Sequence, residues 1–337
     1  MEDYTKMEEK DLPLQLQDVK DAQERIRGHV VRTPLLRTEE LDEALGCTMY
    51  VKPEMLQVTG AFKARGAFNK VLKLTDEERK RGIIFSSSGN HAAACAYVAK
   101  QFGIDAYAVI PEDTPKAKIE NCERRGGHVI LWDRDYRSRM KKVQDEIAEH
   151  GYTLVHGFDD YDVMAGQGTI GLEVLEDCPD LDVIVVPIGG GGLISGISTA
   201  IKGIHPETRV IGVQAAACCG YYESKKTGKM ERVVTRPTIA DGIECTYPTE
   251  NPFPIVMKRV DEIVTVEEED IMKACALIGS GAHLVAEPTS SVVVAALLEK
   301  KINVRPEDKV CCVLTSGNYD IDQIGSLYQG QMVEAVD

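Results

Sequence analysis

A lysine in a small, mostly apolar stretch is the first residue of this sequence whose setting suggests chemistry. Residues 60–67 read GAFKARGA, which places Lys63 between Phe62 and Ala64. Most lysines lie on the surface or pair with acids, but an amine whose surroundings lower its pKa becomes a nucleophile. At this point a surface lysine, an ion-pair partner and a nucleophile all remain open.

Three segments of small and hydrogen-bonding residues follow apolar runs that are typical of buried strands. They are SSSGNH at 86–91 after GIIF, four glycines at 189–192 after DVIVVPI, and TSGN at 315–318 after KVCCVL. Ligands of open parallel sheets bind beyond the carboxyl ends of the strands. We therefore expect these three segments to contribute to one site.

The glycines Gly189, Gly190, Gly191 and Gly192 favour a phosphate site. Without a Cβ the backbone can approach a ligand closely, and its N–H groups, together with a helix N-terminus, attract an anion. A flexible turn is the alternative. The spacing is neither GxGxxG nor a P-loop, because no Lys-Ser/Thr pair follows. A phosphorylated cofactor of another kind is therefore expected.

The segment at 86–91 places hydroxyl and N–H groups at a predicted helix start, which suits a carboxylate, although it could be an N-cap alone. The site would then bind a phosphate, a carboxylate and a lysine. Pyridoxal 5'-phosphate with an amino-acid substrate meets all three demands, with Lys63 forming the Schiff base.

The composition excludes several classes of protein. The chain has 337 residues, enough for one large or two ordinary domains, and its net charge of −15 argues against a nucleic-acid partner. No apolar run reaches the length of a membrane span, and the N-terminus MEDYTKMEEKD has no signal or transit character. The ten cysteines include no CxxC pair, which predicts reduced, buried thiols and a cytoplasmic location.

From residue 82 onward, predicted strands alternate with predicted helices, which implies an α/β fold with parallel sheets. We expect the first dozen residues to be disordered and the stretch from about 215 to 260 to form loops over a surface or a cleft. Strands are predicted at 47–56, 82–88, 106–111, 128–132, 152–157, 182–188, 209–214 and 309–318, and helices at 14–26, 91–103, 115–127, 137–151, 165–177, 193–204, 268–279 and 290–301.

From about residue 18 to 330, the chain resembles the fold-type II pyridoxal-phosphate enzymes, and within them the serine/threonine dehydratase and serine racemase family. The resemblance implies a tryptophan-synthase-β-like fold of two open, twisted, mostly parallel sheets with helices on both faces. It further implies a large cofactor-binding domain at 1–73 and 155–337, a small α/β domain inserted at 74–154, and a homodimer. The matching motifs are TGAFKARGA (59–67), SSGNHA (87–92), AGQGTIGLEV (165–174), VPIGGGGLISG (186–196), TIADGI (238–243), AEPTSSV (286–292) and TSGNYDI (315–321).

The resemblance also implies a role for each site residue. The cofactor would contact Phe62, Lys63, Asn90, Gly189, Gly190, Gly191, Gly192, Glu287 and Thr315, and the substrate carboxylate would contact Ser87, Ser88, Asn90 and His91. Lys63 would form the Schiff base and then remove the α-proton. The β-hydroxyl would leave with the help of an acid, for which the cofactor phosphate is a candidate. The Thr315 hydroxyl would meet the pyridine nitrogen, although Ser316 beside it is an alternative, and a hydroxyl there favours prompt elimination.

Ser88 leaves the choice between lyase and racemase open. Family members limited to elimination commonly have Ala there, whereas racemases have a serine that acts opposite the lysine; Ser88 could also be a carboxylate ligand or a helix cap. The EPT sequence at 287–289 resembles the racemases. The segment from Gln214 to Gly220, QAAACCG, lacks the carboxylates that bind Mg²⁺ or Ca²⁺ in the racemases, so no metal is expected. The segment CTYPTENPFP departs from the family pattern and leaves substrate preference open.

The primary hypothesis is a threonine/serine ammonia-lyase, and the alternative is a serine or other amino-acid racemase with dehydratase side activity. A non-catalytic amino-acid sensor is a third possibility, against which the intact Lys63 and glycine loop argue. We expect no regulatory domain after the catalytic region. His156 and His283 are interpreted as structural, and the acidic cluster of Asp159, Asp160 and Asp162 as a solvated loop.

Overall fold

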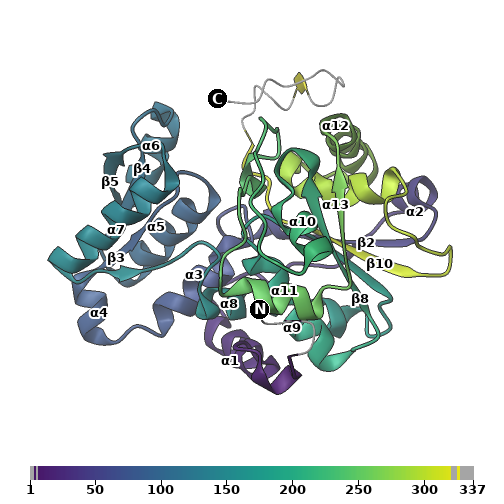
Figure 1. The fold of residues 1–337 in the computed structure, drawn as a ribbon, viewed down its shortest axis with the longest axis horizontal. Helices are drawn as coiled ribbons and strands as arrows, with labels where there is room; N and C mark the ends of the chain where they lie inside the picture. The colour runs from purple at the N-terminus through teal and green to yellow at the C-terminus, as the bar shows by residue number, and fades with distance from the viewer. Residues whose placement is uncertain (1–3, 5–6, 320–324, 327–337) are drawn as a thin grey trace.

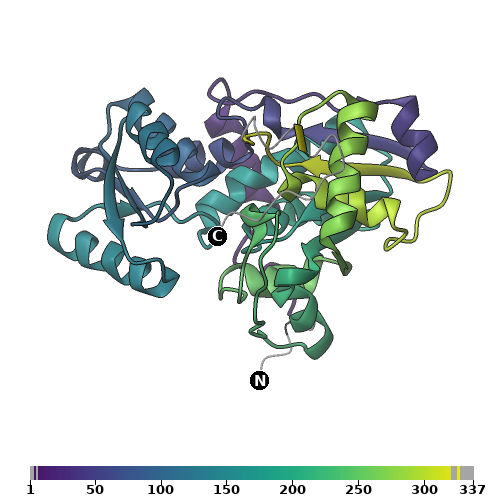
Figure 2. The same ribbon diagram turned by 90° about the horizontal axis from the view of Figure 1, so that it is seen from above.

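The structure is a computed structural model that describes residue 4, residues 7–319 and residues 325–326. Of the motif TSGNYDI, residues 320 and 321 lie outside the described residues. The chain forms two bodies, each built around its own sheet (Figure 1). The view from above shows the smaller body projecting from one side of the larger (Figure 2).

The larger body contains a six-stranded sheet in the order β1-β2-β10-β7-β8-β9. Every neighbouring pair is parallel except β1 and β2. Because β7 and β10 are parallel neighbours, the glycine loop and the TSGN segment leave the sheet at the same edge. The strands are β1 (Leu36–Arg37), β2 (Thr48–Pro53), β7 (Val183–Pro187), β8 (Arg209–Ala215), β9 (Glu262–Val266) and β10 (Lys309–Leu314).

The smaller body contains a parallel four-stranded sheet in the order β5-β4-β3-β6. Its strands are β3 (Ile83–Phe85), β4 (Ala106–Pro111), β5 (Gly127–Trp132) and β6 (Thr153–Leu154). The mixed α/β architecture with two mostly parallel sheets confirms the predicted fold class. We propose that residues 74–154 form the inserted domain, because all four strands fall within this range.

Helices cover both sheets, and glycines end several of them. Gly103 after α5 and Gly151 after α7 adopt the left-handed conformation that favours glycine at this position. The α-helices are α1 (Leu16–Ile26), α2 (Glu39–Leu45), α3 (Lys63–Leu72), α4 (Asp76–Arg81), α5 (Asn90–Phe102), α6 (Lys116–Arg124), α7 (Tyr136–His150), α8 (Tyr161–Asp177), α9 (Gly192–Ile204), α10 (Gly220–Thr227), α11 (Pro252–Arg259), α12 (Glu268–Leu277) and α13 (Pro288–Leu298). The short helical turns are η2 (Glu9–Asp11), η3 (Glu54–Leu56), η4 (Ala216–Cys218), η5 (Asp241–Ile243) and η6 (Ile278–Ala282), the last of which is a π-helix.

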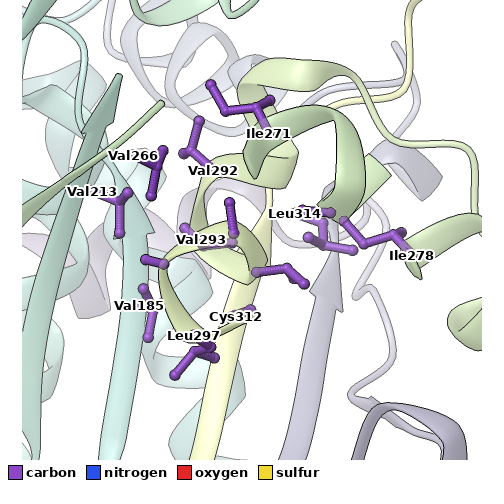
Figure 3. Close-up of a cluster of buried hydrophobic side chains, with 14 of the residues drawn as sticks. Val185, Val213, Val266, Ile271, Ile278, Val292, Val293, Leu297, Cys312 and Leu314 are labelled. Atoms are coloured by element: carbon purple, nitrogen blue, oxygen red, sulfur yellow. The ribbon is translucent and has the colours of Figure 1, made fainter. Parts of the chain in front are cut away.

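A large apolar core lies between the six-stranded sheet and the helices α12 and α13 (Figure 3). Val185, Val213 and Cys312 point from the strands toward Val293 and Leu297 of α13. The apolar residues of α13 are buried all around the helix, as is typical of a helix in a protein interior. This packing fixes the strands whose carboxyl ends carry the polar segments.

The expectation of a disordered N-terminal dozen is wrong for residues 9–12. Glu9–Asp11 form the turn η2, and Leu12 and Leu14 are buried. The Glu9 carboxylate lies 2.8 Å from the Arg259 guanidinium, which attaches this segment to α11. Burial of two leucines and this ion pair explain why the polar composition of the segment was misleading. Among the described residues, no helix combines the length and the apolar character that crossing a membrane requires.

Candidate active site

Lys63 is the first residue of α3, at the junction of the two bodies (Figure 1). Its Nζ donates a hydrogen bond of 2.7 Å to the carbonyl of Gly157 and lies 5.0 Å from the centre of the Phe62 ring. No carboxylate in residues 7–319 pairs with this amine. Burial lowers the pKa of Lys63 to about 8, because the charged form loses hydration that no acid replaces. The amine is therefore poised to act as a nucleophile or a base near neutral pH.

A buried ion cluster around Arg65, two residues after Lys63, holds α3 in place. The Arg65 guanidinium lies 2.8 Å from the Glu54 carboxylate and 2.7 Å from that of Glu173, and Lys52 lies 2.6 Å from Glu173. All four side chains are buried. Because Glu54 follows β2 and Glu173 belongs to α8, the cluster connects α3 to both elements. It thereby fixes the position of Lys63 without contacting its amine.

The glycine loop between β7 and α9 accepts no side chain. A Cβ at Gly190 would lie 2.2 Å from the Phe158 ring, and one at Gly192 would lie 2.5 Å from the Phe158 carbonyl oxygen. Gly191 has a φ of +91°, and a Cβ there would lie 2.4 Å from the Tyr221 hydroxyl. The first N–H groups of a helix lack partners within the helix, so the start of α9 offers several donors beside this bare backbone. This arrangement fits a phosphate group.

Asn90, the first residue of α5, is bonded to two residues from the C-terminal third of the chain. Its Nδ2 donates to Glu287 Oε1 at 3.0 Å, and its Oδ1 accepts from Asn318 Nδ2 at 2.8 Å. Asn318 also donates its main-chain N–H to Glu287 at 2.9 Å. Burial raises the pKa of Glu287 to about 7, although the Asn90 bond opposes this shift. These contacts bring the SSSGNH segment of the smaller body to the edge of the larger sheet.

The side chains of the SSSGNH segment have different surroundings. His91 is buried, its Nε2 lies 2.8 Å from the Val155 carbonyl oxygen, and burial lowers its pKa to about 3. Only the main-chain N–H of His91 is thus available to a ligand in this geometry. Ser87 and Ser88 are partly buried, and Ser86 accepts a hydrogen bond of 3.3 Å from Arg139 Nε. The segment therefore presents serine hydroxyls and a helix N-terminus, but not the imidazole.

Thr315 and Ser316 lie at the end of β10 and are both buried. Thr315 Oγ1 lies 2.9 Å from the Ser290 hydroxyl, and the Thr315 carbonyl accepts from the N–H of Phe62 at 3.0 Å. Ser290 also accepts from the main-chain N–H of Ser316 at 2.9 Å. The main chain of Thr315 is thus bonded to the residue that precedes Lys63, so the predicted cofactor residues at 62, 63 and 315 are neighbours.

The site also contains several residues for which the sequence predicted no role. Phe158 packs against the glycine loop, Gly157 accepts from Lys63, and Ser290 and Asn318 hold Thr315 and Asn90. Ser290 and Asn318 lie inside quoted motifs, so their hydrogen-bonding side chains were an available signal. Gly157 and Phe158 had no such signal in the sequence, because a main-chain carbonyl and an isolated aromatic ring form no motif.

The acidic cluster at the start of α8 consists of structural carboxylates, so its interpretation as a solvated loop is wrong for Asp160 and Asp162. Asp160 caps α8 and lies 2.8 Å from Lys70, which also lies 3.1 Å from Asp162. Asp159 accepts the main-chain N–H of Asn251 at 3.2 Å. Capping and ion pairing therefore explain this cluster.

The segment after β8 is also occupied by structural contacts. Gln214 is buried, and its side-chain oxygen accepts from the main-chain N–H of Tyr222 at 2.9 Å. Its amide donates to the carbonyls of Ile188 and Cys218, both at 3.3 Å. Within the part of the chain that the structure describes, no three His, Cys, Asp or Glu side chains gather into a group that could hold a metal. The absence of a metal stays a prediction.

Comparison with known proteins identifies the family. A model of the pyridoxal-phosphate dependent enzymes matches residues 26–316. The chain belongs to this family. It is 44% identical over 324 residues to an L-threonine ammonia-lyase from Thermotoga maritima, covering 95% of this chain and 79% of that protein.

Solved structures of the family have the same fold. A threonine deaminase from T.th. is 38% identical with a TM-score of 0.85, covering 91% of this chain and 99% of that one. A serine racemase from Dictyostelium discoideum is 34% identical with a TM-score of 0.87, with the same coverage. The expected cofactor, pyridoxal phosphate, is thus confirmed by the family.

Proposed function

We propose that this pyridoxal-phosphate enzyme is an ammonia-lyase for L-threonine and L-serine. It would convert L-threonine to 2-oxobutanoate and ammonia, and L-serine to pyruvate and ammonia. The observation that carries the proposal is the Lys63 amine, whose lowered pKa and carbonyl partner suit covalent cofactor attachment and base chemistry. The threonine ammonia-lyase and threonine deaminase relatives support the elimination reaction.

We assign the cofactor to the residues that the resemblance implied, because their surroundings fit it. Lys63 would attach the cofactor, and Gly189–Gly192 with the N-terminus of α9 would bind its phosphate. Phe62, Asn90, Glu287 and Thr315 would surround the ring. When bound, the cofactor supplies an electron sink that makes the α-proton of the substrate acidic.

The protein's own groups would then direct the elimination. Ser87, Ser88 and the main-chain N–H groups of Asn90 and His91 would hold the substrate carboxylate at the start of α5. Lys63 Nζ would take the α-proton, which it can do near pH 8 because burial keeps part of the amine uncharged. The Gly157 carbonyl would orient that amine.

A serine racemase with dehydratase side activity is the second candidate, and Ser88 is the observation that favours it. Racemisation needs a second acid or base on the face opposite Lys63, and a hydroxyl at position 88 could supply one. The similarity to the Dictyostelium racemase fits this reading. We expect Ser88→Ala to retain L-serine elimination and to lose all reactions of D-serine. Equal loss of both would show that Ser88 has no separate role.

One assay separates the candidates. The purified holoenzyme is incubated with L-threonine, L-serine and D-serine, and the 2-oxo acid and the enantiomers of serine are quantified. We expect 2-oxobutanoate and pyruvate as the main products. D-serine formed from L-serine with little 2-oxo acid would identify a racemase instead, and no turnover with tight amino-acid binding would identify a sensor.

We further propose a cytoplasmic homodimer that acts on a small amino acid and not on nucleic acid or a membrane. All ten cysteines are free, and eight of them are buried, as expected in a reducing compartment. The net charge of −15 disfavours nucleic acid. Light scattering of the purified holoenzyme would test the dimer.

A further inference from the structure

The segment between β6 and α8 contacts both the reactive lysine and a tyrosine of the small domain. Gly157 accepts a hydrogen bond from Lys63 Nζ at 2.7 Å, and the preceding residue, His156, has its Nε2 3.0 Å from the Tyr136 hydroxyl. Phe158 packs on the glycine loop. Tyr136 is therefore joined to the predicted catalytic lysine through two adjacent residues, His156 and Gly157.

We propose that Tyr136 donates a hydrogen bond to the side-chain hydroxyl of the substrate, and that His156 is the positioning residue that orients it. This inference rests on the proposed reaction with L-threonine and L-serine. It makes Tyr136 a determinant of specificity for amino acids with a β-hydroxyl.

The proton on His156 decides the direction of the bond to Tyr136. Nδ1 of His156 accepts two main-chain N–H bonds, from Phe158 at 3.3 Å and from Asp159 at 2.8 Å. A nitrogen that accepts cannot carry the proton, so the neutral ring carries it on Nε2. Burial lowers the pKa of His156, which keeps the ring neutral. Nε2–H thus donates to the Tyr136 oxygen, and the phenolic O–H is left to donate elsewhere.

Tyr136 is held in place and remains accessible. It begins α7, and the guanidinium of Arg139, one turn later, lies 5.8 Å from the ring centre. Arg139 in turn donates to Ser86 in the predicted carboxylate-binding segment. Burial of the phenol, with a smaller contribution from the nearby Cys245, raises the pKa of Tyr136 to about 12, so it stays protonated. The residue as a whole is 41% exposed, so the protein does not enclose it.

The remaining part of the substrate determines what this donor would bind. The cofactor would bind the amino group of the substrate, and the SSSGNH segment would bind its carboxylate. The β-substituent would then face the small-domain side of the site. A hydroxyl oxygen accepts a hydrogen bond, and it does so more strongly as it gains negative charge on leaving. A methyl group, or a leaving group that departs without such help, would gain nothing from Tyr136.

The test compares Tyr136→Phe with the wild-type holoenzyme on L-serine and on β-chloro-L-alanine, whose chloride leaves without a donor. We expect kcat/KM for L-serine to fall about 10- to 100-fold, the range for a hydrogen bond to a group that gains charge. Initial rates with β-chloro-L-alanine should stay within about 3-fold of wild type. Tyr97→Phe, which removes a tyrosine hydroxyl from α5 of the same domain, is the matched control and should behave as wild type.

Binding measured by stopped-flow absorbance, before elimination proceeds, gives a second readout that does not depend on the proposed reaction. Tyr136→Phe should weaken binding of L-serine to the holoenzyme, measured from its absorbance change, and leave that of L-alanine unchanged. If the wild type turned over neither L-serine nor L-threonine, the proposed function would fail, while the binding comparison would still decide the role of Tyr136. Equal loss for both substrates and both ligands, or no loss at all, would overturn the inference.

Variants of His156 test its positioning role. His156→Gln keeps a side-chain amide able to donate to Tyr136, whereas His156→Ala removes the donor. We expect His156→Ala to lower the ratio of L-serine turnover to β-chloro-L-alanine turnover, as Tyr136→Phe does. His156→Gln should have a ratio between those of His156→Ala and the wild type. Equal ratios in the two variants would show that His156 does not orient Tyr136.

Discussion

The side-chain amide of Asn90 lies 3.0 Å from the carboxylate of Glu287, although 197 residues separate them. Asn90 begins α5 of the smaller body, and Glu287 directly precedes α13 of the larger one. The bond therefore crosses the junction between the two bodies at the site where the cofactor is proposed to lie. Because Glu287 is a buried acid, the contribution of this contact region can be tested through the pH dependence of stability.

Glu287 should make the stability of the apoprotein depend on pH. Its pKa is raised from 4.5 to about 7 on folding, so the folded protein keeps this proton to a higher pH than the unfolded chain. The Glu287 contribution to the free energy of unfolding is thus full below pH 4.5 and is lost as the pH rises to about 7. The free energy of unfolding, measured in urea, should decrease between pH 5 and pH 8 in the wild type. In Glu287→Gln this decrease should be roughly 2 to 3 kcal/mol smaller.

The exposed Glu77 provides the control for Glu287. Its side chain is 73% exposed in an ion pair with Lys80, so Glu77→Gln should leave the pH dependence as in wild type. A Glu287→Gln protein whose stability falls between pH 5 and pH 8 as much as that of the wild type would contradict the assigned shift.

The Lys63 amine should set the pH dependence of cofactor uptake. Only the uncharged amine attacks an aldehyde, and burial lowers its pKa to about 8. The rate of covalent uptake by the apoprotein, followed by absorbance, should rise about tenfold per pH unit below pH 8 and level off above it. Lys63→Ala should show no covalent uptake and no turnover, whereas Lys73→Ala, which changes an exposed lysine just after the same helix, should match wild type. Borohydride labelling of a lysine other than Lys63 would refute the assignment.

Gly190 should be intolerant of any side chain because of Phe158. An alanine Cβ would lie 2.2 Å from the Phe158 ring, so Gly190→Ala must displace the ring or the loop. We expect cofactor affinity, measured by fluorescence titration, to fall about 10- to 100-fold. Combining Gly190→Ala with Phe158→Ala should recover part of that affinity. A double variant as weak as the sum of the single effects would mean that the ring is not the obstacle.

Two arginines that pair with acids of α8 should differ sharply in their contribution to stability. Arg65 is fully buried between Glu54 and Glu173, and Arg65→Ala would leave these carboxylates without their partner. We expect a loss of about 3 to 5 kcal/mol in the free energy of unfolding. Arg32 pairs with Glu176 and Asp177, but its side chain is 50% exposed, so Arg32→Ala should lose less than about 1 kcal/mol. Similar losses from the two variants in urea titrations would contradict this burial argument.

The sequence predicted the order of most strands and helices because their apolar patterns are strong. The strand AYAVIP and the helix that ends at Gly103 occur where the pattern placed them. The sequence could not predict the turn at Glu9–Asp11, since that turn depends on contacts with Arg259 far along the chain. It also could not predict that the His91 ring points toward Val155, because a helix N-terminus leaves side-chain direction to its surroundings.

The residue types and their local spacing fixed the chemistry of this protein: a lysine among small residues, glycines after a buried strand, and hydroxyls at strand ends. These are properties of short segments, so they can be read without coordinates. The tertiary structure decided which groups meet. The hydrogen bonds from Lys63 to Gly157, from Asn90 to Glu287 and from His156 to Tyr136 join residues of different elements, and only the packing of those elements sets the distances. The lowered pKa of Lys63 follows from the same packing, because it is burial that removes water from the amine.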